Sequence, residues 1–383
     1  MTSFIALPVF LLVAIPFATC AVPVDFTTYT SCADRCDTTG HNPELPCQCN
    51  QKCQEYNDCC SDYSGTCLTC RGRCNLSYDD DLPCQCNSKC DKYDDCCDDV
   101  KDHCARMATV TDVELATFSE DILSNDVNNC GSLVSLNTQG STCFSCTKDA
   151  APEPLLTVRT EAYQKPTISK LLPLHNNYVF LTGQPEVVTN DEVREETEFL
   201  DAIMTTPAMK KAEKFLLDKR LIVSGRRSGG GQNNAAVRDA VQQIWFGLYS
   251  RENRTLGSSG FEHVFLGEVK NGQVSGFHNW VFFSKEEVNS KLNYRGRIGT
   301  VVNLGAKGKI LKHKFDWNNR EKPISSMFVG TSPEFEIALY TVCFYARPGA
   351  RCPVKLNGKN VNIQTHYMNR LGNRYVASAF PDI

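Results

Sequence analysis

Between Thr111 and Arg251 the chain places apolar residues three and four positions apart, with charged residues between them. This spacing matches the period of an α-helix, so it predicts amphipathic helices. The clearest segments are TDVELATFSEDILSND (111–126), NDEVREETEFLDAIMTTPAMKKAEKFLLDKRL (190–221) and NNAAVRDAVQQIWFGLYSR (233–251). The central part of the chain is therefore expected to be helical.

After Gly260 the pattern changes to short runs of β-branched and aromatic residues, separated by Asn-Gly, Gly-Arg and Pro-Gly turns. Such runs predict strands. We expect strands in FEHVFLGEV (261–269), NWVFFS (279–284), IGTVVNLG (298–305), SSMFVG (325–330), FEIALYTVCFYA (335–346), VNIQTHYM (361–368) and RYVASAFP (374–381). Helices followed by antiparallel strands give an α+β fold class, with a helical N-terminal part and an antiparallel β-rich C-terminal part.

The first 20 residues have no charged side chain and contain an apolar run from Phe4 to Ala18. That run is shorter than the roughly 20 residues of a membrane span, so we expect a signal peptide over 1–20 and a secreted, extracellular protein. An uncleaved membrane anchor is the alternative, and we expect no membrane span later in the chain. The 22 cysteines fit an oxidising compartment. In that compartment Asn75 and Asn253 stand in acceptor sequences for glycosylation.

Sixteen of the cysteines lie between residues 32 and 104 and form two copies of one pattern. LPCQCNQKCQEYNDCCSDY (45–63) aligns with LPCQCNSKCDKYDDCCDDV (82–100), which indicates a duplication with modules at 28–68 and 69–106. Each copy is too short and too poor in large apolar residues for burial alone to offset its chain entropy. We therefore expect disulfides to hold it, with zinc as the less favoured alternative.

The spacing CxxxC…CxCxxxC…CC…C, with Tyr-Asn/Asp-Asp before the double cysteine, resembles the somatomedin B domain. Sequence alone leaves many pairings of eight cysteines open. The resemblance implies four bridges in the first copy: Cys32–Cys49, Cys36–Cys67, Cys47–Cys60 and Cys53–Cys59.

Charge divides the chain at the end of these modules. Residues 21–105 carry 7 Lys+Arg against 16 Asp+Glu, a net of −9, which leaves 33 against 28, a net of +5, for residues 106–383. An acidic module repels phosphate, so we expect the two modules to contact an extracellular protein partner. The larger part could face a polyanion, although ordinary surface variation would account for its charge equally well.

Two of the seven histidines, His263 and His278, flank an Asn271-Gly272 turn. If this is the two-residue turn of a type I′ hairpin, pairs across the ladder sum to 543. His278 is then opposite Phe265 and one diagonal step from His263, roughly 7–8 Å away. A phosphate group could bridge that gap, so the spacing can place two imidazoles on one surface.

The same register puts Glu262 and Glu268 on the face opposite to the histidines, unless bulges at Gly267 or Gly276 shift it. Two imidazoles suit an RNA transphosphorylation, in which the 2′-hydroxyl loses a proton and the leaving 5′-oxygen gains one. A cation would stabilise the charge that builds on the phosphorane. A packed or capping role is the alternative for each histidine taken singly.

Four segments resemble the EndoU family of poly(U)-preferring endoribonucleases, which includes XendoU-type and placental protein 11-like enzymes: GFEHVFLGE (260–268), GFHNWVFF (276–283), EKPISSMFVGTSPEFEIALYTVCFYAR (321–347) and NRYVASAFP (373–381). The resemblance begins near Thr109 and implies an EndoU domain over 109–383. It implies His263 as general acid, His278 as general base and Lys322 as the cation. It also implies that Tyr375 orients the nucleotide and that Ser326, beside Ser325, contacts uracil.

Mn²⁺ is the cofactor implied by the same resemblance. Carboxylates suit this ion, and Glu262 and Glu268 match acidic positions of the family. We nevertheless favour a role in the fold for both glutamates and leave the metal ligands unassigned. A second basic feature, the run KGKILKHK (307–314), is interpreted as a solvated strand, with contact to the RNA backbone as the alternative.

The remaining cysteines suggest further bridges. Cys143 and Cys146 could form part of a zinc site, but a disulfide with a partner such as Cys130 is favoured in an oxidising compartment. Cys343 and Cys352 flank a tight turn and are expected to pair. One cysteine of this half is then left free.

We therefore expect a secreted endoribonuclease that cleaves single-stranded, U-containing RNA at uridylates and leaves 2′,3′-cyclic phosphate ends. The alternative from another class is an extracellular adaptor with a catalytically silent EndoU scaffold. A secreted serine protease is disfavoured, because the GSSG at 257–260 is not a G-x-S-x-G motif.

Overall fold

The computed structural model describes residues 30–383, except 33–35, 37–40, 42, 44, 51, 71–72, 75–77, 79–81, 88, 105–109, 223–234 and 371–372. The expected signal peptide and the Asn75 sequon lie outside the described residues. Asn253 is exposed, as a glycosylation acceptor must be. Among the described residues no helix is both long and apolar enough to cross a membrane.

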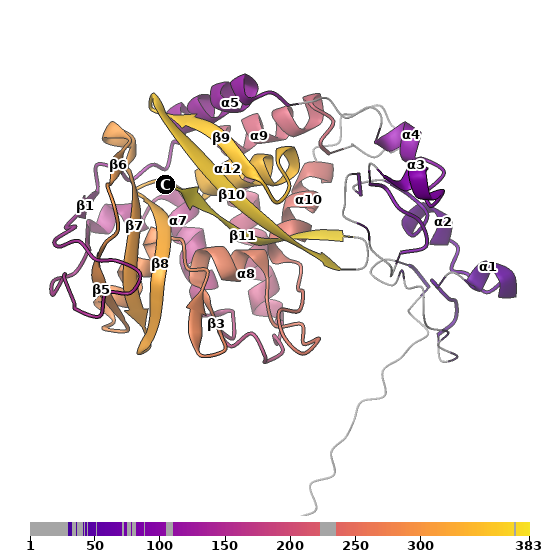
Figure 1. Ribbon diagram of the computed structural model, residues 1–383, viewed down its shortest axis with the longest axis horizontal. Helices are drawn as coiled ribbons and strands as arrows, with labels where there is room; N and C mark the ends of the chain where they lie inside the picture. Colours follow the sequence, from indigo (N-terminus) through magenta and orange to yellow (C-terminus); the bar gives the residue numbers. More distant parts are fainter. Residues whose placement is uncertain are drawn as a thin grey trace, which may run out of the picture.

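The N-terminal region consists of two cysteine-rich modules, drawn in indigo and violet in Figure 1. Each contains two single-turn helices: α1 (Cys53–Tyr56) and α2 (Tyr63–Thr66), then α3 (Cys90–Tyr93) and α4 (Val100–His103). The four bridges implied for the first module are confirmed, and the second module repeats them as Cys70–Cys86, Cys74–Cys104, Cys84–Cys97 and Cys90–Cys96. Both cores consist mainly of cysteine, as expected for units too small to rely on apolar burial.

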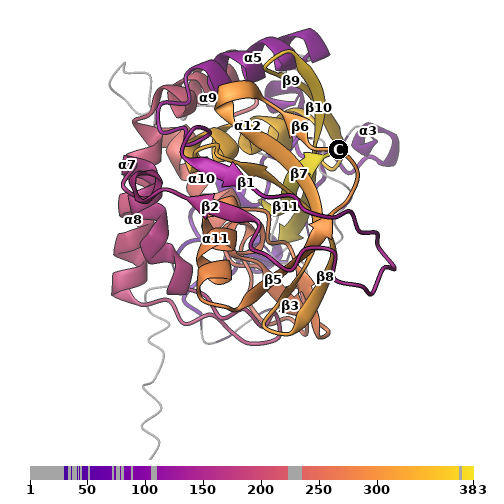
Figure 2. The ribbon, with the colours of Figure 1, turned by 90° about the vertical axis from the view of Figure 1, so that its left-hand side faces the viewer.

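The larger region begins with helices, and the predicted helical segments are confirmed. They form α5 (Asp112–Ser124), α8 (Asn190–Met204), α9 (Pro207–Asp218) and α10 (Ala235–Phe246), with the short helices α6 (Thr160–Tyr163), α7 (Pro166–Leu171) and η2 (Leu172–Asn176) between them. Thr111 and Thr189 start α5 and α8 with capping boxes, which satisfy N–H groups that the first turn leaves open. In Figure 2, α7 and α8 lie along one side of the region and β8 lies on the other.

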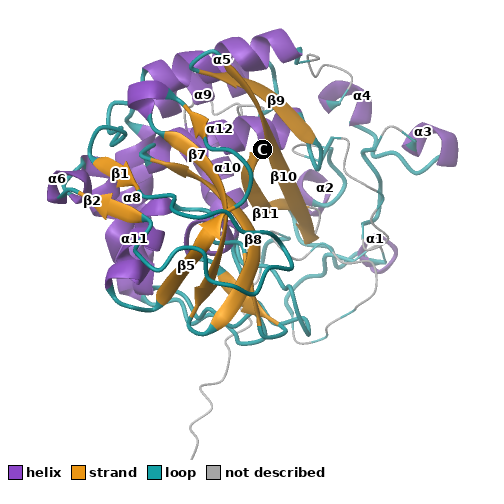
Figure 3. Cartoon of the chain, turned by 60° about the vertical axis from the view of Figure 1, so that its left-hand side comes forward, coloured by secondary structure: helices purple, strands orange, loops and turns teal. Residues whose placement is uncertain are grey.

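Two antiparallel sheets carry most of the strands. One has the order β11-β10-β9, from β9 (Arg351–Leu356), β10 (Lys359–Arg370) and β11 (Asn373–Asp382). The other joins β5 (Leu292–Arg297), β6 (Val302–Asn303), β7 (Lys309–Trp317) and β8 (Arg320–Val329), with the short helix η4 (Gly305–Lys307) before β7. Two small hairpins add β1 (Val134–Leu136) with β2 (Leu156–Val158), and β3 (Glu268–Lys270) with β4 (Gln273–Ser275). Figure 3 shows both larger sheets with α5 and α9 above them, and the α+β class is confirmed.

Four predicted strands are wrong in whole or in part. Of residues 298–305, only 302–303 form a strand, and the segment ends at the start of η4. Residues 262–266 form a π-helical turn, η3 (Glu262–Leu266). Residues 280–284 begin α11 (Trp280–Val288), which Asn279 caps by accepting two backbone N–H groups. Residues 335–346 belong to α12 (Pro333–Ala346), which is buried almost throughout. A helix surrounded by protein has no polar face, so its sequence lacks the helical period and reads as a strand.

The cysteine predictions in this region are partly right. Cys343 pairs with Cys352, whereas Cys143 pairs with Cys146. The proposed use of Cys130 as their partner is wrong, because Cys130 is the one free thiol among the described residues and is fully buried. Burial raises the pKa of this thiol to about 12, so it is an inert core residue.

Candidate active site

The Asn271-Gly272 hairpin forms with the predicted register, because Glu268 pairs with Ser275 and Val269 with Val274. Both turn residues have positive φ angles, 50° and 77°, as a type I′ turn requires. The ladder does not continue to the histidines, however. It ends on one side at η3 and on the other at residue 276, so the predicted pairing of Phe265 with His278 is wrong.

Glycines turn the chain out of the hairpin at both ends. Gly267 (φ 91°) ends η3, and Gly276 has a φ of 68°. A Cβ on Gly276 would lie 1.9 Å from the carbonyl oxygen of His263, so only glycine allows this approach. The backbone N–H groups of Phe277 and His278 then donate to the carbonyls of His263 and Val264. This crossing brings the two imidazoles to a centroid distance of 6.4 Å.

His263 is backed by a carboxylate. Its Nδ1 lies 2.6 Å from Oε2 of Glu268, and the same oxygen lies 2.8 Å from Nε of Arg251. The prediction that Glu268 faces away from the histidines is therefore wrong, because it assumed an extended strand through a π-helical turn. Burial and the Arg251 charge lower the pKa of His263 to about 4, against the opposing effect of Glu268. The His263 partner holds the pKa of the buried Glu268 carboxyl below its usual value.

Glu262 is the second carboxyl of this cluster and has a different state. It is buried, and in the part of the chain that the structure describes neither of its carboxyl oxygens has a hydrogen-bond partner. Burial and the neighbouring Glu268 and Glu186 raise its pKa well above the usual value, which favours the neutral form of this carboxyl. The pKa of Glu268 is shifted in the opposite direction.

His278 is backed by a peptide carbonyl instead. Its Nδ1 lies 2.8 Å from the carbonyl oxygen of Ser326 and 3.3 Å from Oγ of Ser325. A carbonyl only accepts, so Nδ1 carries the proton and Nε2 keeps its lone pair. The ring stacks on Phe380 at a centroid distance of 4.9 Å and an angle of 22°. Burial and the Lys322 charge lower the pKa of His278 well below its usual value.

Lys322 on β8 completes the cluster. Its charge acts on both imidazoles, lowering the pKa of each. Burial lowers the pKa of Lys322 itself to about 8, partly offset by the Glu268 carboxylate. The structure therefore brings together His263, His278 and Lys322, three groups that the sequence places far apart.

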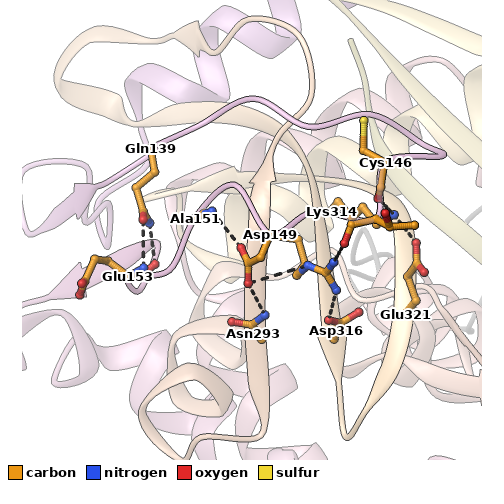
Figure 4. A network of polar contacts seen from close by, with 11 residues as sticks. Gln139, Cys146, Asp149, Ala151, Glu153, Asn293, Lys314, Asp316 and Glu321 are labelled. Carbon is orange, nitrogen blue, oxygen red and sulfur yellow. Dashed lines mark hydrogen bonds and ion pairs between the residues drawn. The ribbon is translucent and has the colours of Figure 1, made fainter.

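The basic run 307–314 is not a solvated strand throughout, because His313 and Lys314 are buried. Lys314 donates to the carbonyls of Phe144 and Cys146 and forms an ion pair with Glu321. Figure 4 shows it holding the segment that carries the Cys143–Cys146 bridge. Lys314 therefore has a structural role.

The two residues expected to bind the nucleotide differ in position. Ser326 is beside His278, but its hydroxyl donates to the carbonyl of Pro381 at 2.6 Å. Tyr375 lines a separate cavity with Arg370 and the end of α10. The aromatic ring that stacks on His278 is Phe380, a residue that sequence reasoning missed together with Arg251.

The carboxylates do not fit a Mn²⁺ site in this arrangement. Glu268 is engaged by His263 and Arg251, and burial raises the pKa of Glu262, which disfavours the carboxylate form that a metal ion would bind. Within the described ranges, the groups whose donor atoms converge closely enough to hold a metal ion are two cysteine trios, and their sulfurs are already in disulfides. We derive no chemical step through a metal.

Comparison with known proteins identifies both regions. The family model described as Endoribonuclease XendoU matches residues 114–381, and the somatomedin B domain matches 30–69 and 68–107. The chain belongs to the XendoU endoribonuclease family. A protein of Bos taurus named uridylate-specific endoribonuclease is 34% identical over 91% of this chain and 93% of its own length.

Other relatives match a smaller part of this chain. Uridylate-specific endoribonuclease D of Xenopus laevis is 36% identical over 72% of this chain and 90% of its own length. The solved structure titled "The structure of XendoU: a splicing independent snoRNA processing endoribonuclease" has 33% identity and a TM-score of 0.58, and the match covers 70% of this chain and 95% of that one. The resemblance to both families is confirmed.

Proposed function

We propose that this chain is a secreted endoribonuclease that cleaves single-stranded RNA at uridylates by attack of the 2′-oxygen, leaving 2′,3′-cyclic phosphate ends. The observation that carries the proposal is the pair of imidazoles at 6.4 Å beside the charge of Lys322. The names of the relatives support the uridylate preference, and the ten described disulfides support secretion.

The hydrogen bonds of the two histidines suggest their roles. Nε2 of His278 is a free acceptor, because the Ser326 carbonyl fixes the proton on Nδ1, so His278 takes the proton of the 2′-hydroxyl. The 2′-oxygen attacks phosphorus and the bond from phosphorus to the 5′-oxygen breaks. His263, whose protonated form Glu268 stabilises, gives its proton to the leaving 5′-oxygen.

Substrate binding favours the protonated form of His263, which takes up its proton from solvent. In the free protein, burial and Arg251 favour neutral His263, with a pKa of about 4. An RNA phosphate adds a negative charge near the ring and so favours the imidazolium. The Lys322 ammonium, with a pKa of about 8, stabilises the additional charge of the phosphorane.

Two parts of the proposal rest on family resemblance. Ser326 is proposed to contact uracil, and Ser326→Ala should then lower the preference for uridine over cytidine more than it lowers total cleavage. The second part is Mn²⁺ dependence. Glu262 and Glu268 do not form a metal site in this arrangement, and cleavage measured in the presence of EDTA tests whether the metal is needed.

The deciding experiment incubates the purified protein with a U-containing oligoribonucleotide and with the matched oligodeoxynucleotide, with Mn²⁺ or with EDTA. Mass spectrometry of the ends should show cyclic phosphate after uridine, and the deoxy strand should remain intact. RNA that binds with a steep salt dependence but is never cut would instead indicate a silent scaffold.

A further inference from the structure

A cavity of about 330 Å³ lies between α10 and β11, apart from the histidine pair. Its lining combines a guanidinium, two amides, a carboxyl and an aromatic ring, provided by Arg370, Gln242, Gln243, Glu196 and Tyr375. Cavities of this size hold small ligands or single groups of larger ones. The mixture of donors and acceptors matches the edge of a nucleobase. The Tyr375 ring is buried and forms a wall of the cavity.

The position of Tyr375 in this cavity is fixed by close packing. A Cβ on Gly247 would lie 2.4 Å from Cε1 of the Tyr375 ring, so the glycine leaves the space that the ring uses. Arg370 contacts the Leu248 carbonyl at 3.5 Å, and Gln242 donates to Glu196 at 3.1 Å. Gln243 is exposed at the rim.

A β-bulge aligns this cavity with the histidine pair. In the β10–β11 ladder Tyr375 pairs with Met368, whereas Phe380 pairs with Gln364. Residues 375 and 380 would point to opposite faces of a regular strand, but the register shifts once between them. Because the bulge absorbs one residue, both rings point to the face shared by Gln364 and Met368.

The same face is continuous between the two rings. His366, at the intermediate position of β10, is exposed and lies 6.2 Å from Phe380 between ring centroids. Four residue steps of strand separate Gln364 from Met368, about 13 Å at roughly 3.3 Å per residue. One strand of stacked nucleic acid advances about 3.4 Å per nucleotide, so that distance spans at most about four nucleotides.

We propose that the cavity lined by Arg370, Gln243 and Tyr375 binds a second nucleotide of the RNA strand whose uridylate lies at His263 and His278. This inference rests on the proposed endoribonuclease function. It implies that the enzyme binds an RNA segment longer than the dinucleotide that is cleaved. The bound strand follows the exposed face of β10 and β11, from Phe380 past His366 to the cavity. The cleavage efficiency should therefore depend on the length of the RNA as well as on the uridylate itself.

The test measures kcat/KM for oligoribonucleotides with one uridine, starting from a uridine dinucleotide and extended by one to six adenosines on either side. The wild type should show a step of about tenfold on one side only, once the chain reaches the cavity, as expected for one hydrogen bond to a charged group such as Arg370. Arg370→Gln and Gln243→Leu should each remove most of the step, with the dinucleotide as internal reference. Gln243 is exposed, so its substitution tests the cavity without a large risk to folding.

Lys214→Gln is the matched control, because Lys214 is an exposed lysine of α9 and its loss changes net charge in the same way as Arg370→Gln. It should keep the step. A wild type without a step, a step that survives both cavity variants, or a step equally reduced by Lys214→Gln would overturn the inference. If no oligoribonucleotide is cut at any length, the proposed function fails as well; a cut dinucleotide without a step rejects only the second subsite.

Discussion

The surroundings of His263 and of His278 differ although the two imidazoles lie 6.4 Å apart. Nδ1 of His263 faces the Glu268 carboxylate, which Arg251 also contacts. Nδ1 of His278 faces an uncharged carbonyl, and its ring is covered by Phe380. A carboxylate stabilises an imidazolium, whereas a carbonyl only fixes a tautomer. The difference favours His263 as the acid and His278 as the base.

The largest expected effect is the loss of either histidine. His263→Ala and His278→Ala should each lower the cleavage rate by roughly 10² to 10⁴, because each removes one proton transfer. Initial rates on a U-containing oligoribonucleotide measure this, together with thermal unfolding to show that the fold survives. His41→Ala, at an exposed histidine of the first module, should keep full activity. A double-digit percentage of activity in either active-site variant would exclude that histidine from the mechanism.

The carboxylate behind His263 gives the next effect. Glu268→Gln removes the negative charge that stabilises protonated His263, and supporting residues of this kind typically contribute about 10- to 100-fold to activity. Glu262→Gln is the control, since burial raises the pKa of this carboxyl and favours its neutral form, for which an amide is a close substitute.

Initial rates of both glutamine variants, measured with Mn²⁺ and with EDTA, separate two roles for these residues. Support of His263 predicts a large loss only for Glu268→Gln. Equal losses in the two variants, relieved by excess Mn²⁺, would instead make the pair metal ligands.

The sequence predicts the cysteine-rich modules better than the active site, for a physical reason. Each module has few apolar residues besides its eight cysteines, so the disulfides form most of its core. The resemblance to the somatomedin B domain therefore predicts all four bridges of the first module correctly. The active site depends on backbone irregularities instead. The hairpin register was predictable from Asn271-Gly272, but nothing in the residue pattern marks residues 262–266 as a π-helical turn.

The same limit applies to the faces of Tyr375 and Phe380. Both are aromatic residues of one predicted strand, and parity alone puts them on opposite faces. The bulge between them decides which positions share a face, and no residue type in RYVASAFP signals it. The role of Tyr375 in orienting the nucleotide comes from family resemblance and stays a prediction. Lys322 was likewise identified by family resemblance. From the residue pattern alone the lysine-rich run at 307–314 would be the stronger candidate, because the sequence does not show that Lys314 contacts the disulfide-bridged segment.

Phe380 covers His278, so its loss tests the carbonyl-backed half of the site. Phe380→Leu keeps apolar bulk but removes the flat ring, and KM for RNA should rise about tenfold, within the range of one base–aromatic stack. Steady-state kinetics should show the change in KM with a smaller change in kcat. Phe144→Leu, at an exposed ring beside the disulfide, is the control. An equal rise in both variants would mean that Phe380 does not contact the nucleotide.

The smallest effect at neutral pH concerns Lys322, whose charge lowers the pKa of both histidines. With a pKa of about 8, Lys322 is mostly charged at pH 7, and only about one-tenth remains charged at pH 9. The pKa values of both histidines lie far below pH 8. Their contribution to the slope of log(kcat/KM) against pH therefore does not change between pH 7 and pH 9. The wild-type profile should therefore steepen by one further unit of slope above pH 8. Lys322→Arg stays charged and should lack this break, with a modest loss at pH 7, since a guanidinium replaces a point charge with a planar group. A break that persists at pH 8 in Lys322→Arg would assign the titration to another group and leave the cation of the reaction to be sought elsewhere on β7 and β8.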